Sequence, residues 1–548
     1  MNIHRARLLA AALAVGAILP APALADTWVH NVQGVQANDD GTLQRFGGLR
    51  IGNDGRVVAL LQSRGAVKAS KKDRVIDGHG RTLLPGLIDA HGHLFGLGLG
   101  LLSLDLTGTT SIGDLQQRLR TYAAANPGTG WIQGRGWNQE EWPGKRFPTS
   151  ADLDAAVSGR PVWLERVDGH ASVGNSAALK AAGITAAIQA PSGGRIENGM
   201  FVDAASGLVE RHIPPPTPAL LARALAAAQL KMLESGLTAM ADMGTDPTGW
   251  KLLRTTGARG GLKVRVMSYA SDIDTLTALR MVRPTPWLFG DRLRMGGVKL
   301  YADGALGSRG AWLKADYKDA PGRGLPLLTP AQLRARVEIA SLRGFQVAVH
   351  AIGDAANAAV LETYDLLGSD NGDKRWRIEH AQIVDVADLP KFALFKVIAS
   401  MQPVHETSDW RMAQARVGEA RLGGAYAWRT LLTSNARLAF GSDFPVESPN
   451  PFPGLAAAVY REDAAGEPAG GWHPGEKLTL GLALRGFTRD AAFAGFADGR
   501  FGSLEPGQWA DFILVDRDVT TASSKALSET QVLQTWVAGK AAWVRSAR

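Results

Sequence analysis

The chain has 548 residues, no cysteine, and a formal charge of +8 from 60 Lys and Arg against 52 Asp and Glu. Its 45% hydrophobic and 20% charged residues are typical of a globular protein, which excludes a disordered chain, a collagen-like repeat and a disulfide scaffold. The length allows about three domains, or one large barrel with additions. The basic excess is small and the only short basic run is 68–74, so we expect no nucleic-acid partner.

Residues 1–25 have the order of a cleavable export signal. Two arginines precede an apolar stretch that starts at Leu8, and an Ala-x-Ala pattern ends at Ala25. A membrane anchor is the alternative, but Gly and Pro interrupt the apolar stretch, which is short for a stable span. We expect cleavage after Ala25, a periplasmic or secreted mature protein without stable membrane insertion, and no need for disulfides.

Both ends of the mature chain are predicted to be rich in β-strands. Residues 49–61 form two apolar runs around an Asn-Asp-Gly turn, which indicates a hairpin. The C-terminal stretch 501–544 has similar short runs between Gly turns. We therefore expect one small β-sandwich built from residues 26–80 and 495–548.

The middle of the chain, residues 81–494, alternates apolar runs with helical patterns such as 329–342 and 355–367. Eight runs are predicted to be strands: Leu87–His91, Leu237–Met243, Val264–Tyr269, Val298–Ala302, Gln346–His350, Arg377–His380, Val397–Gln402 and Leu438–Asp443. Strand–helix alternation repeated eight times is typical of an α/β fold of the (β/α)₈ TIM-barrel type. The first interval is too long for one helix, so we predict an insertion over about 105–215.

Polar side chains stand at the carboxyl ends of four of these strands, and a lysine lies within a fifth. They are His91, His93, Lys299, His350, His380 and Asp443. In a barrel all of these strand ends open onto one face, where active sites form. Imidazole nitrogens and a carboxylate are ligands that Zn²⁺ or a similar divalent ion accepts. The pattern predicts a metal site, against the alternative of hydrogen-bonded structural histidines.

The first two histidines are separated by a single residue. On an extended strand both side chains point the same way, so one ion can bind both. Alone, this H-x-H pattern is a weak signal. It gains weight from "AVHAIGD", "RIEHAQ" and "FGSDFP", which follow in order and each end a predicted strand.

The sequence resembles the amidohydrolase superfamily, and within it the YtcJ-like amidohydrolase 3 family, which includes N-substituted formamide deformylase. The passages that carry the resemblance include "LLPGLIDAHGHL", "VWLERVDGHASVGNSAAL", "VKLYADGALGSRGAWL", "SMQPVHETSDW" and "GSDFPVESPNPF". It implies metal-dependent hydrolysis of C–N bonds on a barrel with a β-sandwich. It also implies metal ligands at His91, His93, His350, His380 and Asp443, with a carboxylated Lys299 that bridges two ions in binuclear members.

The physical argument for Lys299 is separate. An ammonium in an apolar strand beside cations is unfavourable, and conversion to a carbamate makes it an anionic ligand. The alternatives are a lysine paired with Asp303 or another carboxylate, and a cation that touches substrate.

Five further residues are candidates for substrate contact. Asp168 and His170 reach the site from the insertion in one interpretation, and form a polar turn in the other. Arg309 either holds a substrate carboxylate or carbonyl, or makes a structural ion pair. Gln402 and His405 follow the seventh strand and face the same mouth, as direct contacts or as groups that orient the ligands.

These features favour an exported hydrolase of a small-molecule amide, with one or two divalent ions, Zn²⁺ or else Mn²⁺. Asp443 takes the proton from a water and later gives it to the leaving nitrogen. One rival is a mononuclear enzyme with unmodified Lys299. The other is a catalytically silent periplasmic binding protein on the same barrel, for which a base beside a metal has no use. The substrate's identity and the oligomeric state do not follow from the sequence, because loops set the former.

We predict that the mature protein begins at Asp26 and is recovered from the periplasm. N-terminal sequencing of protein from fractionated cells checks this. An intact Met1 on cytoplasmic protein would contradict it.

Overall fold

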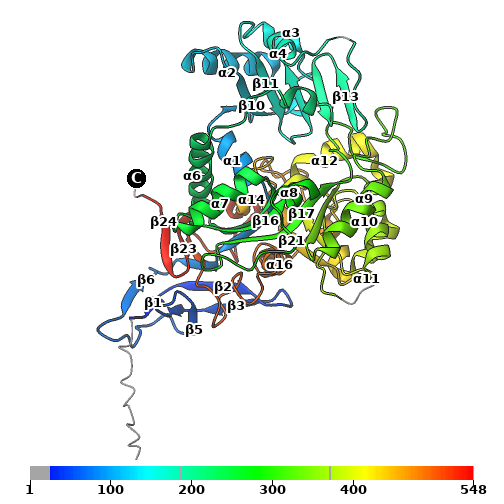
Figure 1. Ribbon diagram of the computed structural model, residues 1–548. Helices are drawn as coiled ribbons and strands as arrows, with labels where there is room; N and C mark the ends of the chain where they lie inside the picture. Colours follow the sequence, from blue (N-terminus) through cyan, green and yellow to red (C-terminus); the bar gives the residue numbers. More distant parts are fainter. Residues whose placement is uncertain (1–24, 186, 369–371, 547–548) are drawn as a thin grey trace, which may run out of the picture.

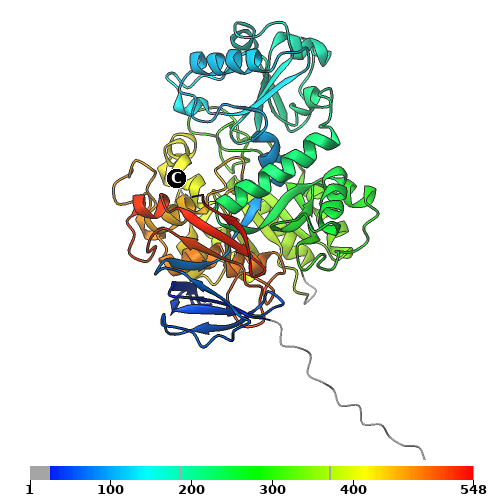
Figure 2. The ribbon, with the colours of Figure 1, turned by 90° about the vertical axis from the view of Figure 1, so that its left-hand side faces the viewer.

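The computed structural model describes residues 25–185, 187–368 and 372–546. Nearly all of the predicted export signal therefore lies outside the described residues. A barrel forms the centre of the molecule, a β-sandwich lies against one end of it, and the insertion lies over the other end (Figures 1 and 2). Along the described chain, no helix combines the length and the apolar character needed to cross a membrane.

Eight parallel strands form the barrel sheet, and the order of the strands in the sheet follows the chain. They are β8 (Leu87–Gly92), β15 (Leu237–Thr245), β16 (Arg265–Ala270), β17 (Leu293–Tyr301), β18 (Gln346–Ala351), β19 (Arg377–His380), β20 (Ile398–Met401) and β21 (Arg437–Phe440). A bridge between Gly92 and Phe444 joins the last strand's loop to the first strand. The predicted TIM barrel is confirmed.

Helices alternate with the strands around the barrel. They are α1 (Leu94–Gly100), α6 (Pro218–Glu234), α7 (Pro247–Ala258), α8 (Ile273–Ala278), α9 (Pro330–Leu342), α10 (Asp354–Leu367), α11 (Leu389–Leu394), α12 (Pro403–Val417), α13 (Trp428–Thr433) and α14 (Pro451–Tyr460). Helix α9 begins after Thr329, whose side chain forms a capping box with Gln332, and Pro330 occupies the first turn. This local signal explains why the pattern over 329–342 located the helix.

The eighth strand is shorter than predicted. It ends at Phe440, and Asp443 lies three residues beyond it with a left-handed backbone (φ 60°). The amide of Asp443 donates a hydrogen bond of 2.7 Å to the carbonyl of His91. After Phe440 the chain turns away from the direction of the strand. This turn places Asp443 over the carboxyl ends of the barrel strands.

The two chain termini together build the β-sandwich. Its four-stranded sheet has the order β5 (Val57–Leu61), β4 (Gly48–Ile51), β1 (Thr27–His30), β6 (Arg74–Asp77). Its six-stranded sheet has the order β24 (Lys540–Val544), β23 (Val532–Val537), β22 (Phe512–Val515), β7 (Thr82–Pro85), β2 (Gln33–Ala37), β3 (Leu43–Phe46). Buried residues of both termini, such as Val29 and Phe512, share one core. Strand β7 extends the N-terminal part beyond residue 80.

Short helices join the barrel to the sandwich. They are α15 (Leu480–Gly486), α16 (Arg489–Ala494) and α17 (Ser524–Ser528). Alanines of α16 pack against buried residues from inside the barrel, such as Ile88 and Ala439. The interior of the barrel is therefore filled at the end next to the sandwich.

The insertion between β8 and β15 contains its own sheet and core. The sheet has the order β13 (Gly194–Glu197), β14 (Met200–Asp203), β12 (Ala171–Gly174), β11 (Val162–Arg166), β10 (Ile132–Trp137), β9 (Leu104–Asp105). Helices α2 (Ile112–Ala125), α3 (Ser150–Asp154), α4 (Ser176–Ala181) and α5 (Gly207–Glu210) accompany it. Both ribbon views place this unit over the open end of the barrel (Figures 1 and 2).

We predict that a buried ion pair between barrel and sandwich is essential for stability. Arg265 on β16 lies 2.6 Å from the carboxylate of Asp511, just before β22, and both are buried. Arg265→Leu leaves that carboxylate buried without a counter-ion, so the free energy of unfolding should fall by about 3–5 kcal/mol. Urea unfolding measures the change.

Arg323→Leu serves as the matched control. It removes an exposed pair with Asp316, whose side chain is 60% exposed, and should cost at most about 1 kcal/mol. Equal losses in the two variants would show that the buried pair has no special role.

Candidate metal centre

Six polar side chains from separate strands meet at the open end of the barrel. His91, Lys299, His350 and His380 lie on β8, β17, β18 and β19, while His93 and Asp443 lie just beyond strands β8 and β21. All are buried except His93, whose side chain is 31% exposed. They line two adjoining cavities, of about 540 and 1030 Å³, which also take in residues of the insertion.

Asp443 is at the centre of this cluster. Its Oδ1 lies 3.4 Å from Nε2 of His91 and 3.2 Å from Nε2 of His93. On the other side, the rings of His350 and His380 are 4.5 Å apart between centroids, and those of His91 and His380 are 4.8 Å apart. The two histidines of the H-x-H pattern thus do face one carboxylate, as expected for one face of a strand.

Buried hydrogen bonds orient two of the imidazoles. Nδ1 of His91 donates to Glu379 at 2.6 Å, and Nδ1 of His380 donates to the side-chain oxygen of Gln402 at 2.8 Å. Each bond fixes the tautomer and leaves Nε2 as the lone-pair donor. Gln402, predicted to lie at the mouth, therefore orients a ligand.

A buried arginine keeps Glu379 ionised. Burial by itself would raise the pKa of Glu379, but the charge of Arg377 and the bond to His91 outweigh it and hold the pKa at about 2. Nε of Arg377 lies 2.7 Å from Glu379, and the same guanidinium donates to the carbonyl of Ala90. The carboxylate is therefore anionic inside the barrel, where it orients His91.

The donor set fits a divalent metal ion. Burial lowers the pKa of His91 to about 4 and the pKa values of His350 and His380 well below their usual range, so these imidazoles are neutral. Burial would raise the pKa of Asp443, but the surrounding imidazoles outweigh it and keep that pKa well below its usual value. Its buried Oδ1 accepts no hydrogen bond from described residues. An anionic oxygen this close to several imidazole nitrogens forms a donor set that Zn²⁺ or Mn²⁺ would satisfy.

Two overlapping groups of three potential ligands are found among the described residues. One is His91, His93 and Asp443, and the other is His380, His405 and Asp443, with ligand atoms within 4.8 Å of one another in each group. Asp443 belongs to both groups. The arrangement therefore has room for either one or two ions.

Lys299 is enclosed by the metal-ligand cluster. Its Nζ lies 3.2 Å from Nε2 of His91 and 4.6 Å from the ring centre of Tyr301. Burial lowers its pKa to about 8. No ion pair between Lys299 and Asp303 is found among the described residues: that carboxylate accepts the amides of Ile352 and Gly353 and lies 3.5 Å from Nε2 of His350.

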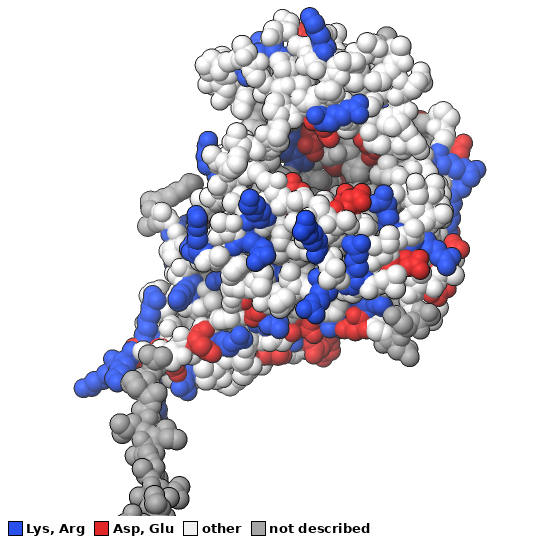
Figure 3. Space-filling model, viewed as in Figure 1, with Lys and Arg blue, Asp and Glu red and all other residues white. Residues whose placement is uncertain are grey.

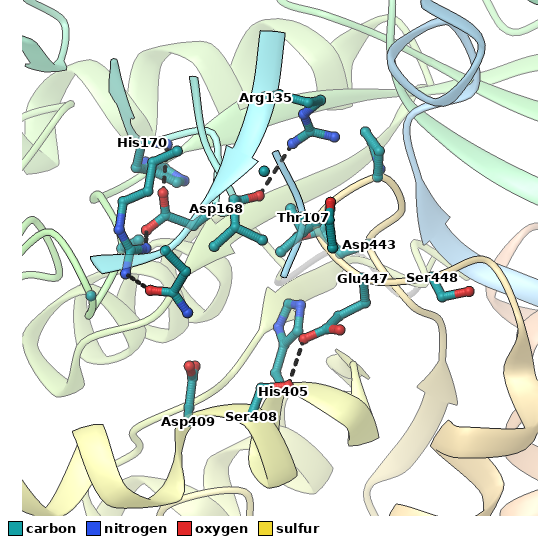
Figure 4. Close-up of a pocket in the computed structure, with 18 of the residues that line it drawn as sticks. Thr107, Arg135, Asp168, His170, His405, Ser408, Asp409, Asp443, Glu447 and Ser448 are labelled. Carbon is teal, nitrogen blue, oxygen red and sulfur yellow. Dashed lines mark hydrogen bonds and ion pairs between the residues drawn. The ribbon is translucent and has the colours of Figure 1, made fainter. Parts of the chain in front are cut away.

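The insertion brings His170 and Asp168 to the site. Nδ1 of His170 lies 2.6 Å from Asp203, and its ring centre is 5.0 Å from that of His350. Asp168 lines both cavities and is hydrogen-bonded to Arg166 (Figure 4). His405, in the first turn of α12, stacks on His380 with ring centres 6.0 Å apart. These three candidates converge on the cavity.

Arg309 does not join them, which corrects the prediction that it holds substrate. Its guanidinium pairs with Asp319 at 2.9 Å, and it lines neither cavity. The structure agrees with the other interpretation of this arginine, a structural ion pair. Asp319 also pairs with Arg416, so Arg309 belongs to a structural cluster of ion pairs away from the cavities.

Sequence reasoning missed several carboxylates at the site, among them Asp203, Glu379, Asp409 and Glu447. A signal existed for Glu379, because a charged residue inside the predicted barrel strand "RIEH" needs a buried partner. Asp203, Asp409 and Glu447 reach the site through the packing of segments that are distant in the sequence, for which no local pattern exists.

We predict that Glu379→Gln weakens metal binding roughly 10- to 100-fold, the usual effect of losing a group that orients a ligand. Glutamine cannot neutralise Arg377, and it holds His91 less firmly. Competition with a chromogenic chelator measures the affinity. Glu362→Gln, the same change on the exposed face of α10, should leave the affinity unchanged; equal affinities in both variants would contradict the role.

Comparison with known proteins identifies the family. Residues 74–542 match the family model described as "Amidohydrolase family". The chain is 33% identical over 484 residues to the protein LONG AFTER FAR-RED 3 of Arabidopsis thaliana, covering 84% of this chain and 82% of the relative. It is 30% identical to the putative amidohydrolase YtcJ of Bacillus subtilis, covering 85% and 90%. It is 27% identical to the N-substituted formamide deformylase of Arthrobacter pascens, covering 87% and 90%.

Solved structures agree with this assignment. An uncharacterized metal-dependent hydrolase from Pyrococcus horikoshii superimposes with a TM-score of 0.75 at 29% identity, covering 91% of this chain and 99% of that one. Another, from Pyrococcus furiosus, gives a TM-score of 0.71 at 30% identity, covering 90% and 100%. The resemblance inferred from the motifs is confirmed. The chain belongs to the amidohydrolase family and is a metal-dependent hydrolase.

Proposed function

We propose that the protein hydrolyses a C–N bond of a small amide, an N-formyl or N-acyl compound or a cyclic amide. The observation that carries this proposal is the position of Asp443. It is an ionised carboxylate that touches both groups of metal ligands and faces the cavity. A relative that bears the name N-substituted formamide deformylase supports the same type of bond.

The six clustered residues would hold one or two ions, with Zn²⁺ or Mn²⁺ as the preferred metals. When bound, the metal would supply Lewis-acid activation of a water and of the substrate carbonyl. Lys299 is suited to a bridging role as a carbamate, because burial among neutral imidazoles disfavours its ammonium form.

Asp443 performs the proton transfers. Its carboxylate accepts a proton from the attacking water, whose oxygen forms the new bond to the carbonyl carbon. The same carboxyl then gives that proton to the nitrogen as the C–N bond breaks. The products are a carboxylic acid and an amine, and Asp443 returns to its ionised state.

His170 acts from the insertion side. Burial opposes its protonation, but the bond to Asp203 and the charges of Asp203 and Asp168 outweigh burial and raise its pKa to about 9. The cationic imidazole is thus available to donate a hydrogen bond to the substrate's carbonyl oxygen as negative charge develops there. The insertion would then complete the site as well as cover it.

The proposal includes export, because the basic, apolar and Ala-x-Ala order of residues 1–25 directs a chain to the periplasm. The substrate would accordingly be met outside the cytoplasm.

One assay tests the reaction type. Purified protein of known metal content is offered N-formyl, N-acyl, cyclic amide and ester substrates, before and after chelation and after addition of Zn²⁺ or Mn²⁺. We expect metal-dependent release of amine from at least one amide. Hydrolysis of none by the loaded protein would favour the silent binding protein, and full activity without metal would end the metal mechanism.

We predict that Asp443→Asn lowers kcat by roughly 10² or more, the scale for loss of a general base. The amide keeps the size and an oxygen ligand but cannot accept the proton. Metal content, measured by elemental analysis, should fall less than activity. Near wild-type turnover would show that another group moves the proton.

Lys299→Ala should instead reduce bound metal from about two ions towards one, since the bridging carbamate is lost. A small carboxylic acid at high concentration should then partly restore both metal and rate. A full metal complement in this variant would exclude the bridge and favour the mononuclear enzyme with an unmodified lysine.

A further inference from the structure

The smaller cavity has a strongly acidic lining. Seven of its lining residues are Asp or Glu, and two are Arg. Figure 3 shows carboxylate side chains gathered in the hollow between the insertion and the barrel. The two arginines already have partners, because Arg166 binds Asp168 and Arg135 lies 3.7 Å from Glu165. The cationic His170 is held by Asp203, and Glu140 pairs with Arg416 and Lys145. Negative charge still predominates in the hollow, because five lining carboxylates have no Lys or Arg partner among the described residues: Asp105, Glu141, Asp409, Asp443 and Glu447.

Two of these carboxylates have only uncharged hydrogen-bond partners among the described residues. Asp409, on α12, accepts from Gln382 at 3.1 Å and from the hydroxyl of Tyr426 at 3.2 Å. Glu447, on the loop after β21, accepts from Ser408 at 2.8 Å. Both side chains line the cavity, and a carboxylate with only uncharged partners is stabilised by a nearby cation.

His405 is a further side chain on this wall that has an unpartnered polar atom. It is 9% exposed and lines the same cavity, yet its Nε2 has no hydrogen-bond partner in the described part of the chain. Figure 4 shows His405 next to Glu447, with Asp409 on the same helix. A buried polar atom facing a cavity usually has a partner in the occupied state.

The geometry favours an organic cation over a further metal ion at this wall. Both described groups with ligand atoms close enough to share an ion omit Asp409 and Glu447. Carboxylates that do not converge on one point suit a larger group with several N–H donors, such as an ammonium on a chain or a guanidinium. The cavity volume of about 540 Å³ accommodates such a group.

We propose that Asp409 and Glu447 form a subsite for a cationic group of the substrate. The substrate is then an acylated amine that carries a second, protonated amine or guanidine. This inference rests on the proposed C–N hydrolysis. Glu447 follows Asp443 by four residues on one loop, so the cation is bound close to the bond that breaks.

Matched substrates test the subsite. N-acetylcadaverine carries an ammonium where N-acetylhexylamine carries a methyl group, and the corresponding formamides and shorter homologues extend the series. We expect kcat/KM to be roughly tenfold or more higher for the cationic member of a pair, since charge-assisted hydrogen bonds have that scale. The Glu447→Gln and Asp409→Asn double variant should lose this preference, while Glu362→Gln, exposed on α10, should keep it.

A binding measurement separates this inference from the reaction itself. The metal-loaded protein is titrated by calorimetry with pentylguanidinium, which cannot ligate a metal through a neutral nitrogen, and with hexanol. We expect the guanidinium to bind roughly tenfold or more tightly than the alcohol, and the double variant to lose the difference. Thermal melting confirms that each variant is folded; should the double variant not fold, each single variant replaces it.

The outcomes are distinct. Guanidinium binding that depends on the two carboxylates, with no hydrolysis of any amide, supports the subsite and overturns the C–N proposal. Hydrolysis of both members of each pair at equal kcat/KM, with no preference for the guanidinium, overturns the subsite and leaves the reaction standing. A preference that survives in the folded double variant also overturns the subsite, because the charge would then be recognised elsewhere.

Discussion

Closure of the barrel between its first and last strands is the constraint on which the site depends. The amide of Asp443 binds the carbonyl of His91, and the buried carboxylate of Asp89 accepts both the amide and the hydroxyl of Ser442. These bonds satisfy backbone groups where the eighth strand ends. They also hold Asp443 against the H-x-H pair, so the contacts that close the barrel also place this candidate ligand.

The interior beneath the ligands contains a buried ionic network, although most of the barrel core is apolar. Arg377 and Glu379 share a strand and are both fully buried, and they neutralise each other with two contacts of 2.7 and 3.0 Å. An unpaired charge there would be costly, but the pair costs much less and presents a carboxylate oxygen to His91. The barrel therefore orients a metal ligand from below, through a rigid element instead of a loop.

The insertion and the barrel loops supply a different kind of chemistry. The barrel strands contribute neutral imidazoles and the clustered lysine, while His170 on the insertion is held by Asp203 and faces His350. The smaller cavity between them is acidic on the side of α12 and the last loop. This division suits an enzyme in which strands determine the reaction and loops determine the substrate.

The sequence by itself determined the barrel and the positions of the clustered residues. Apolar runs mark the strands, and a polar residue at the carboxyl end of each run must face the same mouth once parallel strands close, so His91, His350 and His380 were found from local patterns. The capping signal at Thr329 likewise located a helix from a few residues.

Only the tertiary structure decided which side chains meet across loops. Arg309 turned to Asp319, Gln402 to His380, and Asp203 to His170, while Asp409 and Glu447 came to share a cavity wall. The physical reason is local: side chains alternate between the two faces of a strand, and backbone hydrogen bonds to its neighbours fix its direction. The partner of a loop side chain depends instead on the packing of distant segments, and one sequence carries no local signal for that.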